Sequence, residues 1–320
     1  MARTSGTLQT TLRAPVSLTG IGVHSGLPVS VTLHPADPNT GITFLRTELA
    51  HGGEVEIAAD WRSVAATELC TVIGDPSKAT VATIEHLMAA LRGLMIDNVI
   101  VEIDGAETPV MDGSSAAFID AIDQVGIVTQ SARRRYIKVL KPIRVEAGSG
   151  WAELRPYDGT RFEVTIEFPI DLIGKQTFAA DMTPAVFRKD LSRARTFGFV
   201  KDLEKLIPLG LCRGSSLENS VAIRDDRVLN PEGLRYVDEF VRHKALDAVG
   251  DIALSGAPIL GLFRSYRGGH RLNFQTLQAL FADETAWTLV DGAVARRESS
   301  SNAELGSSMA APAFGPNRAA

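Results

Sequence analysis

A chain of 320 residues exceeds one ordinary domain and is long enough for two, each with its own core. Lys and Arg number 33 against 38 Asp and Glu, so the net charge of -5 provides no basic field that would recruit nucleic acid. The sequence has no apolar run of about eighteen residues that could span a bilayer, and residues 1–10 lack the apolar core of a signal peptide. Cys70 and Cys212 match no CxxC spacing, which fits small core residues in a cytoplasmic protein.

The first half alternates polar and apolar residues with the period of two that is typical of strands. We expect strands at 7–12, 29–33, 42–46, 69–73 and 98–103, and helices over 80–91 and 114–125. The segment 47–66 is irregular, and we interpret it as a small insertion. Because neighbouring strands follow one another without strict alternation of strand and helix, the pattern favours an α+β fold.

Three arginines, Arg133 to Arg135, interrupt this pattern, and we interpret them as a solvated linker or strand edge. We place a boundary there, between an N-terminal α+β domain at 1–132 and a C-terminal α+β domain at 133–297. In the second half we expect strands at 136–140, 143–146, 151–154, 162–168, 258–266 and 287–290, and helices at 183–191, 201–206, 236–254 and 270–282. Residues 298–320 hold almost no large apolar side chains, which predicts a disordered tail.

The helix expected at 236–254 carries charged groups within an apolar pattern. His243, Asp247 and Asp251 are four residues apart, and four residues advance about 400° around a helix, so the three side chains form one row. An imidazole and a carboxylate one turn apart can hold a small cation, but a zinc site needs at least three protein ligands.

A third ligand is expected from His86, one of six histidines, which follows Glu85 on the helix at 80–91. A glutamate beside a ligating histidine is typical of the general base for a metal-activated water. The alternative is that His86 and His243 are ordinary half-buried histidines and that the carboxylates face solvent.

Six segments carry a resemblance to a known family: 83–91 (TIEHLMAAL), 96–105 (IDNVIVEIDG), 109–114, 193–199 (RARTFGF), 238–251 and 269–273 (GHRLN). In order and spacing they resemble UDP-3-O-acyl-N-acetylglucosamine deacetylases, the zinc amidases of lipid A biosynthesis. The likeness extends from about residue 7 to 290. It implies two similar α+β domains, each a layered sheet plus two principal helices, with the helices sandwiched between the sheets and the active site at the domain junction.

The resemblance also implies the roles of the candidate catalytic residues. His86, His243 and Asp247 would hold one Zn²⁺, with Glu85 as the base. His270 would be the acid, kept charged by Asp251, and Thr196 would offer a hydroxyl to the oxyanion. Without the resemblance, Thr196 is interpreted as a β-branched residue that closes a strand.

Substrate contacts follow from the same resemblance. Lys244 and Arg267 would lie towards the nucleotide diphosphate, although a lysine on a helix can also be solvated. Phe168 would lie near the uridine, and Phe197 and Ser215 are further substrate-binding candidates. Two positions depart from the family pattern: Ser215 replaces a glycine, and Gly150 stands where a basic residue is expected.

A glycine-bracketed loop at 20–26 and an inserted unit at about 170–216 complete the predicted site. His24 in the loop is open to three interpretations, a ligand, a substrate contact or a loop hydrogen bonder, and the resemblance places the loop near the acyl chain. The inserted unit carries an apolar set that forms either core or a passage for that chain: Val200, Leu203, Leu206, Leu209 and Cys212.

The function expected from these features is zinc-dependent hydrolysis of the N-acetyl group of UDP-3-O-(3-hydroxyacyl)-N-acetylglucosamine by a monomer. Two alternatives stay open. One is a metalloamidase acting on another acetylated sugar nucleotide. The other is a metal- or nucleotide-binding protein without catalysis.

Overall fold

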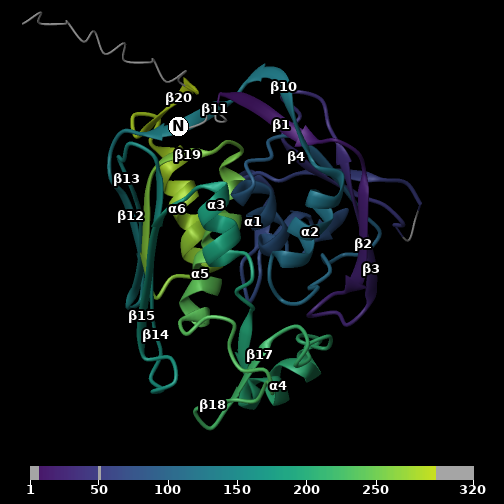
Figure 1. Cartoon of the computed structure of the whole chain (residues 1–320), viewed down its shortest axis with the longest axis vertical. Helices are drawn as coiled ribbons and strands as arrows, with labels where there is room; N and C mark the ends of the chain where they lie inside the picture. The colour runs from purple at the N-terminus through teal and green to yellow at the C-terminus, as the bar shows by residue number, and fades with distance from the viewer. Residues whose placement is uncertain (1–6, 50–51, 293–320) are drawn as a thin grey trace, which may run out of the picture.

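Two β-sheets form the outer layers of the computed structural model, which describes residues 7–49 and 52–292 (Figure 1). The helices lie between the sheets, so both sheets bury one face against them. Several long strands therefore alternate buried and partly buried residues, as in β14, where Phe162, Val164 and Ile166 face the core. The predicted α+β class with sandwiched helices is confirmed.

The first sheet contains five strands from the N-terminal half. Their order is β2 (Val16–Ile21), β3 (Pro28–Pro35), β9 (Val99–Ile103), β4 (Ile42–Arg46) and β5 (Val55–Ala58). A two-stranded ribbon pairs β1 (Leu8–Leu12) with β10 (Ile127–Arg133). A small sheet joins β6 (Val64–Ala66), β7 (Val72–Asp75) and β8 (Ala79–Val81).

The second sheet contains seven strands from the C-terminal half. The order is β12 (Ile143–Ala147), β13 (Gly150–Arg155), β19 (Ile259–Tyr266), β11 (Arg135–Val139) and β20 (Trp287–Asp291), with β14 (Thr160–Glu167) beside β19 and β15 (Lys175–Asp181) beside β14. Since β10 pairs with β1 whereas β11 joins this sheet, we infer that the division between domains falls near residue 133.

Four principal helices fill the middle layer: α1 (Glu85–Gly93), α2 (Ala116–Val125), α5 (Glu239–Ile252) and α6 (His270–Ala282). Helices α1 and α5 cross closely at Gly250, where a Cβ atom would lie 2.0 Å from the carbonyl oxygen of Glu85. Only glycine fits this crossing, which brings the start of α1 against the last turn of α5. No helix in the described ranges is both long and apolar enough to cross a membrane.

A smaller unit projects at one end of the molecule (Figure 1). It contains α4 (Val200–Leu206) and a three-stranded sheet of β16 (Phe197–Phe199), β17 (Val221–Arg224) and β18 (Arg227–Val228). The predicted helix at 183–191 is a short α3 (Pro184–Val186) that continues as a π-turn at Phe187–Leu191.

The structure corrects two sequence interpretations. The segment 47–66 is not merely an insertion, because β5 pairs with β4 in the first sheet. The arginine run is not wholly solvated, because Arg134 is 1% exposed and its Nε and Nη2 donate to Asp97 at 2.9 and 2.7 Å. Strands β2, β5, β6, β8, β10, β15 and β16 to β18 were not predicted. The tail predicted at 298–320 lies outside the described residues.

Candidate metal centre and catalytic site

A cavity of about 320 Å³ lies between the two halves, and its wall contains most of the predicted site residues. Helix α1 contributes Glu85 and His86, α5 contributes His243 and Asp247, and α6 begins with His270. The remaining predicted residues in its wall come from the second half: Thr196, Phe197, Phe168, Ser215 and Lys244.

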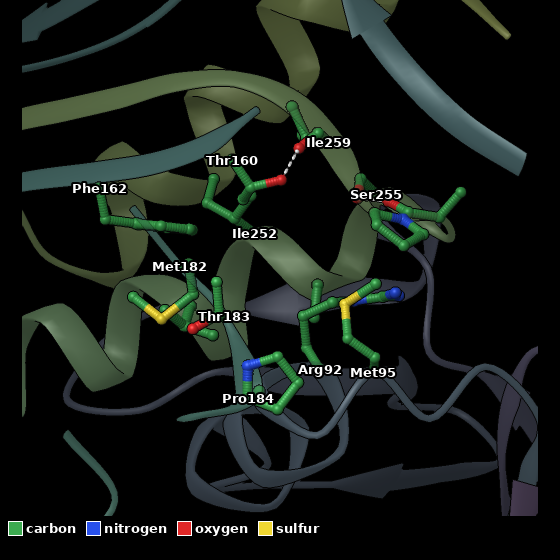
Figure 2. Close-up of a pocket in the computed structure, with 15 residues that line it drawn as sticks. Arg92, Met95, Thr160, Phe162, Met182, Thr183, Pro184, Ile252, Ser255 and Ile259 are labelled. Carbon is green, nitrogen blue, oxygen red and sulfur yellow. Dashed lines mark hydrogen bonds between the residues drawn. The ribbon is translucent and has the colours of Figure 1, made fainter. Parts of the chain in front are cut away.

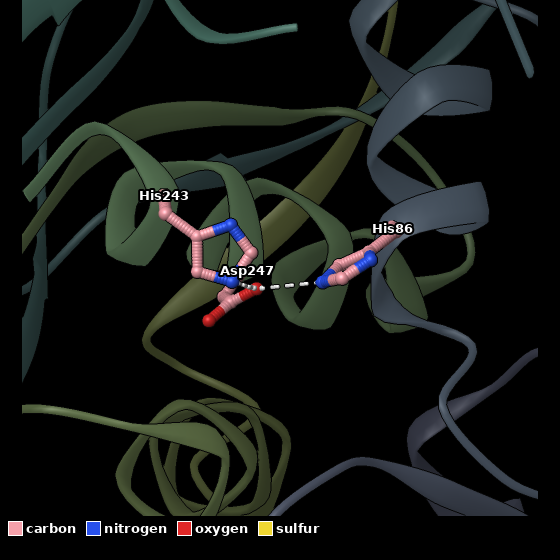
Figure 3. A group of neighbouring side chains, drawn as sticks. All are labelled: His86, His243 and Asp247. Atoms are coloured by element: carbon pink, nitrogen blue, oxygen red, sulfur yellow. Dashed lines mark ion pairs between the residues drawn. The ribbon is translucent and has the colours of Figure 1, made fainter. Parts of the chain in front are cut away.

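Three of these residues converge on one point (Figure 3). The Oδ1 atom of Asp247 lies 3.3 Å from Nε2 of His243 and 3.6 Å from Nε2 of His86. The two imidazole rings meet edge to face at 82°, with centroids 5.0 Å apart. All three side chains are buried, and their ligand atoms lie within 4.8 Å of one another.

The protonation states of this group suit a metal ion. Burial lowers the pKa of His243 to about 3, and its Nδ1 donates to the carbonyl oxygen of Ala194 at 3.1 Å, so Nε2 presents a lone pair. Burial opposes ionisation of Asp247, but His243 and Lys244 outweigh it and hold the pKa well below its usual value. Asp247 Oδ1 is buried without a hydrogen-bond donor, as expected of an atom reserved for a cation.

Lys244 contacts this group directly. Its Nζ donates to Asp247 Oδ2 at 2.9 Å, since residues three apart on a helix are neighbours. One oxygen of Asp247 is thus occupied by lysine, and the other faces the two imidazoles. The contact of Lys244 with the diphosphate stays a prediction.

Glu85 begins α1 next to His86, with its side chain in the cavity wall. Its Oε2 accepts from the backbone N–H of Thr71 at 3.1 Å, and its Oε1 lies 3.8 Å from Nε2 of His270. Burial raises the pKa of Glu85, against the opposing effect of His270 and His86. A carboxylate with a raised pKa is better matched to proton transfer near neutral pH.

His270 is held by Asp251, which is behind the cavity wall. The Nδ1 of His270 donates to Asp251 Oδ2 at 2.9 Å. Burial disfavours the charged ring, but Asp251 and Glu85 overcome it and raise the pKa of His270 to about 9. His270 is therefore an imidazolium at neutral pH, with Nε2 directed towards Glu85 and the cavity.

Arg267 lies outside the wall of this cavity, and its backbone lies close to Gly150. The guanidinium of Arg267 lies 3.2 Å from Ser149 Oγ and 3.6 Å from Glu167 Oε1. At Gly150, a Cβ atom would lie 2.7 Å from the carbonyl oxygen of Arg267. Any side chain at this position would require a backbone shift, so the local backbone favours glycine here.

The loop at 20–26 is fixed by a buried carboxylate that the sequence did not single out. Glu107 accepts from the backbone N–H groups of His24 and Ser25 at 2.8 and 2.9 Å. His24 lines the cavity, and its Nδ1 accepts from the backbone N–H of Cys212 at 3.4 Å. His24 is thus a loop hydrogen bonder, and it is not part of the buried metal-binding group.

The apolar set of the inserted unit lines the cavity instead of forming core. Helix α4 buries none of its residues, whereas four members of the set belong to the cavity wall: Val200, Leu203, Leu206 and Cys212. Leu209 is 74% exposed and lies outside it.

Sequence reasoning also missed Thr71 and Asn273. Thr71 Oγ1 donates to Asp251 Oδ1 at 2.6 Å, and Asn273 Nδ2 donates to Asp251 Oδ2 at 2.8 Å. Asn273 follows His270 by three residues on one helix, a spacing that could have indicated a shared partner. Thr71 precedes a strand, with no local signal of its role.

A second cavity, of about 40 Å³, lies away from these groups (Figure 2). Mostly apolar side chains line it, among them Phe162, Met182, Pro184 and Ile252. It contains none of the predicted site residues, so the chemistry belongs to the larger cavity.

Three side chains that could hold a metal ion lie in the wall of a cavity, next to a carboxylate that could accept a proton, which is the arrangement of a catalytic metal site and not of a closed structural one. The fold and the site are therefore those of a metal-dependent hydrolase.

Comparisons with known proteins give the family. Residues 9–282 match the family model LpxC, described as UDP-3-O-acyl N-acetylglycosamine deacetylase. A relative from Brucella ovis named UDP-3-O-acyl-N-acetylglucosamine deacetylase is 54% identical over 284 residues, covering 88% of this chain and 98% of the relative. Relatives of the same name from Brucella abortus and Brucella melitensis show the same identity and coverage. The chain belongs to the LpxC family, and the resemblance inferred from its sequence is confirmed.

Proposed function

We propose that this chain hydrolyses the N-acetyl group of UDP-3-O-(3-hydroxyacyl)-N-acetylglucosamine to release acetate and the free amine. The observation that carries the proposal is the convergence of His86, His243 and Asp247 beside Glu85 and a charged His270 in one cavity. Family membership supports the substrate.

The proposed cofactor is one Zn²⁺ held by His86, His243 and Asp247. Two neutral imidazoles and one carboxylate are a ligand set typical of catalytic zinc. A zinc ion there would supply Lewis acidity that makes a water molecule more acidic.

Glu85 and His270 divide the proton transfers between them. Glu85 Oε1 accepts a proton from water, whose oxygen forms a bond to the acetamide carbon. His270 Nε2 then donates its proton to the nitrogen as the C–N bond breaks, and acetate and amine separate. Glu85 Oε1 and His270 Nε2 lie 3.8 Å apart, so both can reach one reacting centre. This distance supports the assignment of Glu85 as base and His270 as acid. The Thr196 hydroxyl is the proposed additional donor to the oxyanion.

The proposed substrate contacts surround this centre. Phe168, Phe197, Ser215 and Lys244 would contact the sugar nucleotide, and Arg267 would turn towards the diphosphate from its present place beside Glu167. The apolar residues of α4 would accept the acyl chain. The monomeric state and the cytoplasmic location stay predictions.

The direct test is acetate release by the zinc-replete protein from the 3-O-acylated substrate and from its non-acylated analogue. We expect kcat/KM to be at least about 100-fold lower for the analogue, since each buried methylene contributes about 0.8 kcal/mol and several would be lost. Equal turnover of both would favour the amidase for another acetylated sugar nucleotide. No turnover of either would favour a binding protein without catalysis.

The pH dependence of kcat/KM is expected to be bell-shaped. Glu85 must be ionised, so the rate falls as pH drops through its raised pKa. His270 must be protonated, so the rate also falls as pH rises through about 9.

His270→Ala should lower kcat by about 10²- to 10⁴-fold and remove the alkaline limb. An unchanged alkaline limb in this variant would contradict the assignment of His270 as the acid.

A further inference from the structure

Thr71 lies at the point where the two halves of the catalytic site meet. It is 2% exposed and immediately precedes β7. Its backbone N–H donates to Glu85 Oε2 at 3.1 Å, and its Oγ1 donates to Asp251 Oδ1 at 2.6 Å. One residue of the N-terminal half therefore contacts both the base and the carboxylate that holds the acid.

The contact with Glu85 selects the oxygen that can act as the base. Oε2 accepts the backbone N–H of Thr71. The other oxygen, Oε1, therefore faces Nε2 of His270. This contact needs no particular side chain at position 71, so it survives substitution there.

The contact with Asp251 depends on the hydroxyl. Asp251 Oδ2 accepts from His270 Nδ1 and Asn273 Nδ2, and both donors belong to α6. Asp251 Oδ1 accepts from Thr71, and no other side-chain donor to this atom occurs among the described residues. Asp251 is 3% exposed, so loss of the hydroxyl would leave a charged oxygen buried without its partner.

We propose that Thr71 is a positioning residue for the reaction: its hydroxyl anchors Asp251 so that His270 keeps its proton and its direction towards Glu85. The inference rests on the proposed function for its effect on rate, but its effect on His270 can be measured without turnover. The charged and titratable groups that face His270 are Asp251 and Asp247 on α5, Glu85 on α1, and His24 on the loop at 20–26.

The test compares Thr71→Val, which removes the hydroxyl at nearly constant shape, with Thr71→Ser, which keeps it. We expect Thr71→Val to lower kcat by about 10- to 100-fold, as for other outer partners of catalytic groups, with KM changed less than about threefold and one metal ion retained. Thr71→Ser should restore most of kcat. In metal-replete Thr71→Val, the pKa of His270 followed by NMR of the histidine ring should fall from its wild-type value.

Thr276→Val is the matched control, since Thr276 is fully buried on α6 and its Oγ1 donates to the carbonyl oxygen of Leu272. It should leave kcat and the His270 titration unchanged. If Thr71→Val does not fold, Thr71→Ala, which has no branch to accommodate, provides the same comparison with Thr71→Ser. A wild-type kcat and an unchanged His270 titration in the hydroxyl-free variant would overturn the inference, as would a serine variant as impaired as the valine variant. An inactive wild type whose His270 pKa still falls in Thr71→Val would overturn the proposed function and leave the positioning role standing.

Discussion

Replacing His243 with alanine is expected to remove the bound metal and reduce acetate release below detection. His243 supplies a neutral imidazole whose Nε2 lies 3.3 Å from Asp247 Oδ1, and its other nitrogen is fixed by the Ala194 carbonyl. Without it, only one histidine and one carboxylate remain, fewer than the three protein ligands that a catalytic zinc site uses. The measurement is metal content per chain after dialysis, together with acetate release at saturating substrate.

His34→Ala provides the control for loss of a histidine as such. His34 lies in β3 of the first sheet and pairs with Glu102 at 2.7 Å, with its side chain 34% exposed. This variant should keep one metal ion and the wild-type rate. A His243→Ala protein that also keeps both would exclude His243 as a ligand.

The local parts of the site could be predicted because they repeat at helical spacing. The α6 boundaries, His270 to Ala282, agree with the sequence pattern, and His243 and Asp247 lie one turn apart on α5 as expected. The third member of the group, His86, was found through the glutamate before it. Each of these inferences used residues that are neighbours in the sequence.

The parts that could not be predicted depend on contacts between distant segments. Thr71 and Asp251, which share a hydrogen bond, are 180 residues apart. Arg134 and Asp97, which also share one, belong to opposite halves of the chain. An arginine run usually faces solvent, and only the tertiary contact of Arg134 with the partly buried Asp97 carboxylate overrides that tendency. Lys244 was expected to lie towards the diphosphate, which stays a prediction; its contact with Asp247 was not predicted, although their spacing of three residues on α5 allows it.

The short edge strands were missed because their sequences carry little alternation of their own. Strand β18 has only two residues, and β16 has three. These strands exist because β17 pairs with both of them. Pairing of this kind is a property of the assembled unit, whereas helical periodicity is already present in the isolated sequence.

The second large effect is expected from Glu85→Gln, which should lower kcat by about 10²- to 10⁴-fold while one metal ion stays bound. Glutamine keeps the shape of the side chain and can still accept from the backbone N–H of Thr71, but it cannot take a proton from water. Glu85 is not among the three converging residues proposed as ligands, so metal content should match that of the wild type. Acetate release and metal content measured on the same sample separate this result from that of His243→Ala.

We expect Glu85→Gln to lose activity without losing thermal stability. Burial raises the pKa of Glu85, so its ionised form contributes unfavourably to folding above the pKa of an unfolded glutamate, and this cost is present at pH 7. The neutral glutamine avoids it, and the Tm of Glu85→Gln should be no lower than that of the wild type. Glu153→Gln is the matched control, because Glu153 is also buried but pairs with Arg264 in the second sheet; it should keep full activity and lose stability. A Glu85→Gln protein with wild-type kcat would exclude Glu85 as the base, and one with a lower Tm would indicate that the ionised carboxylate stabilises the fold.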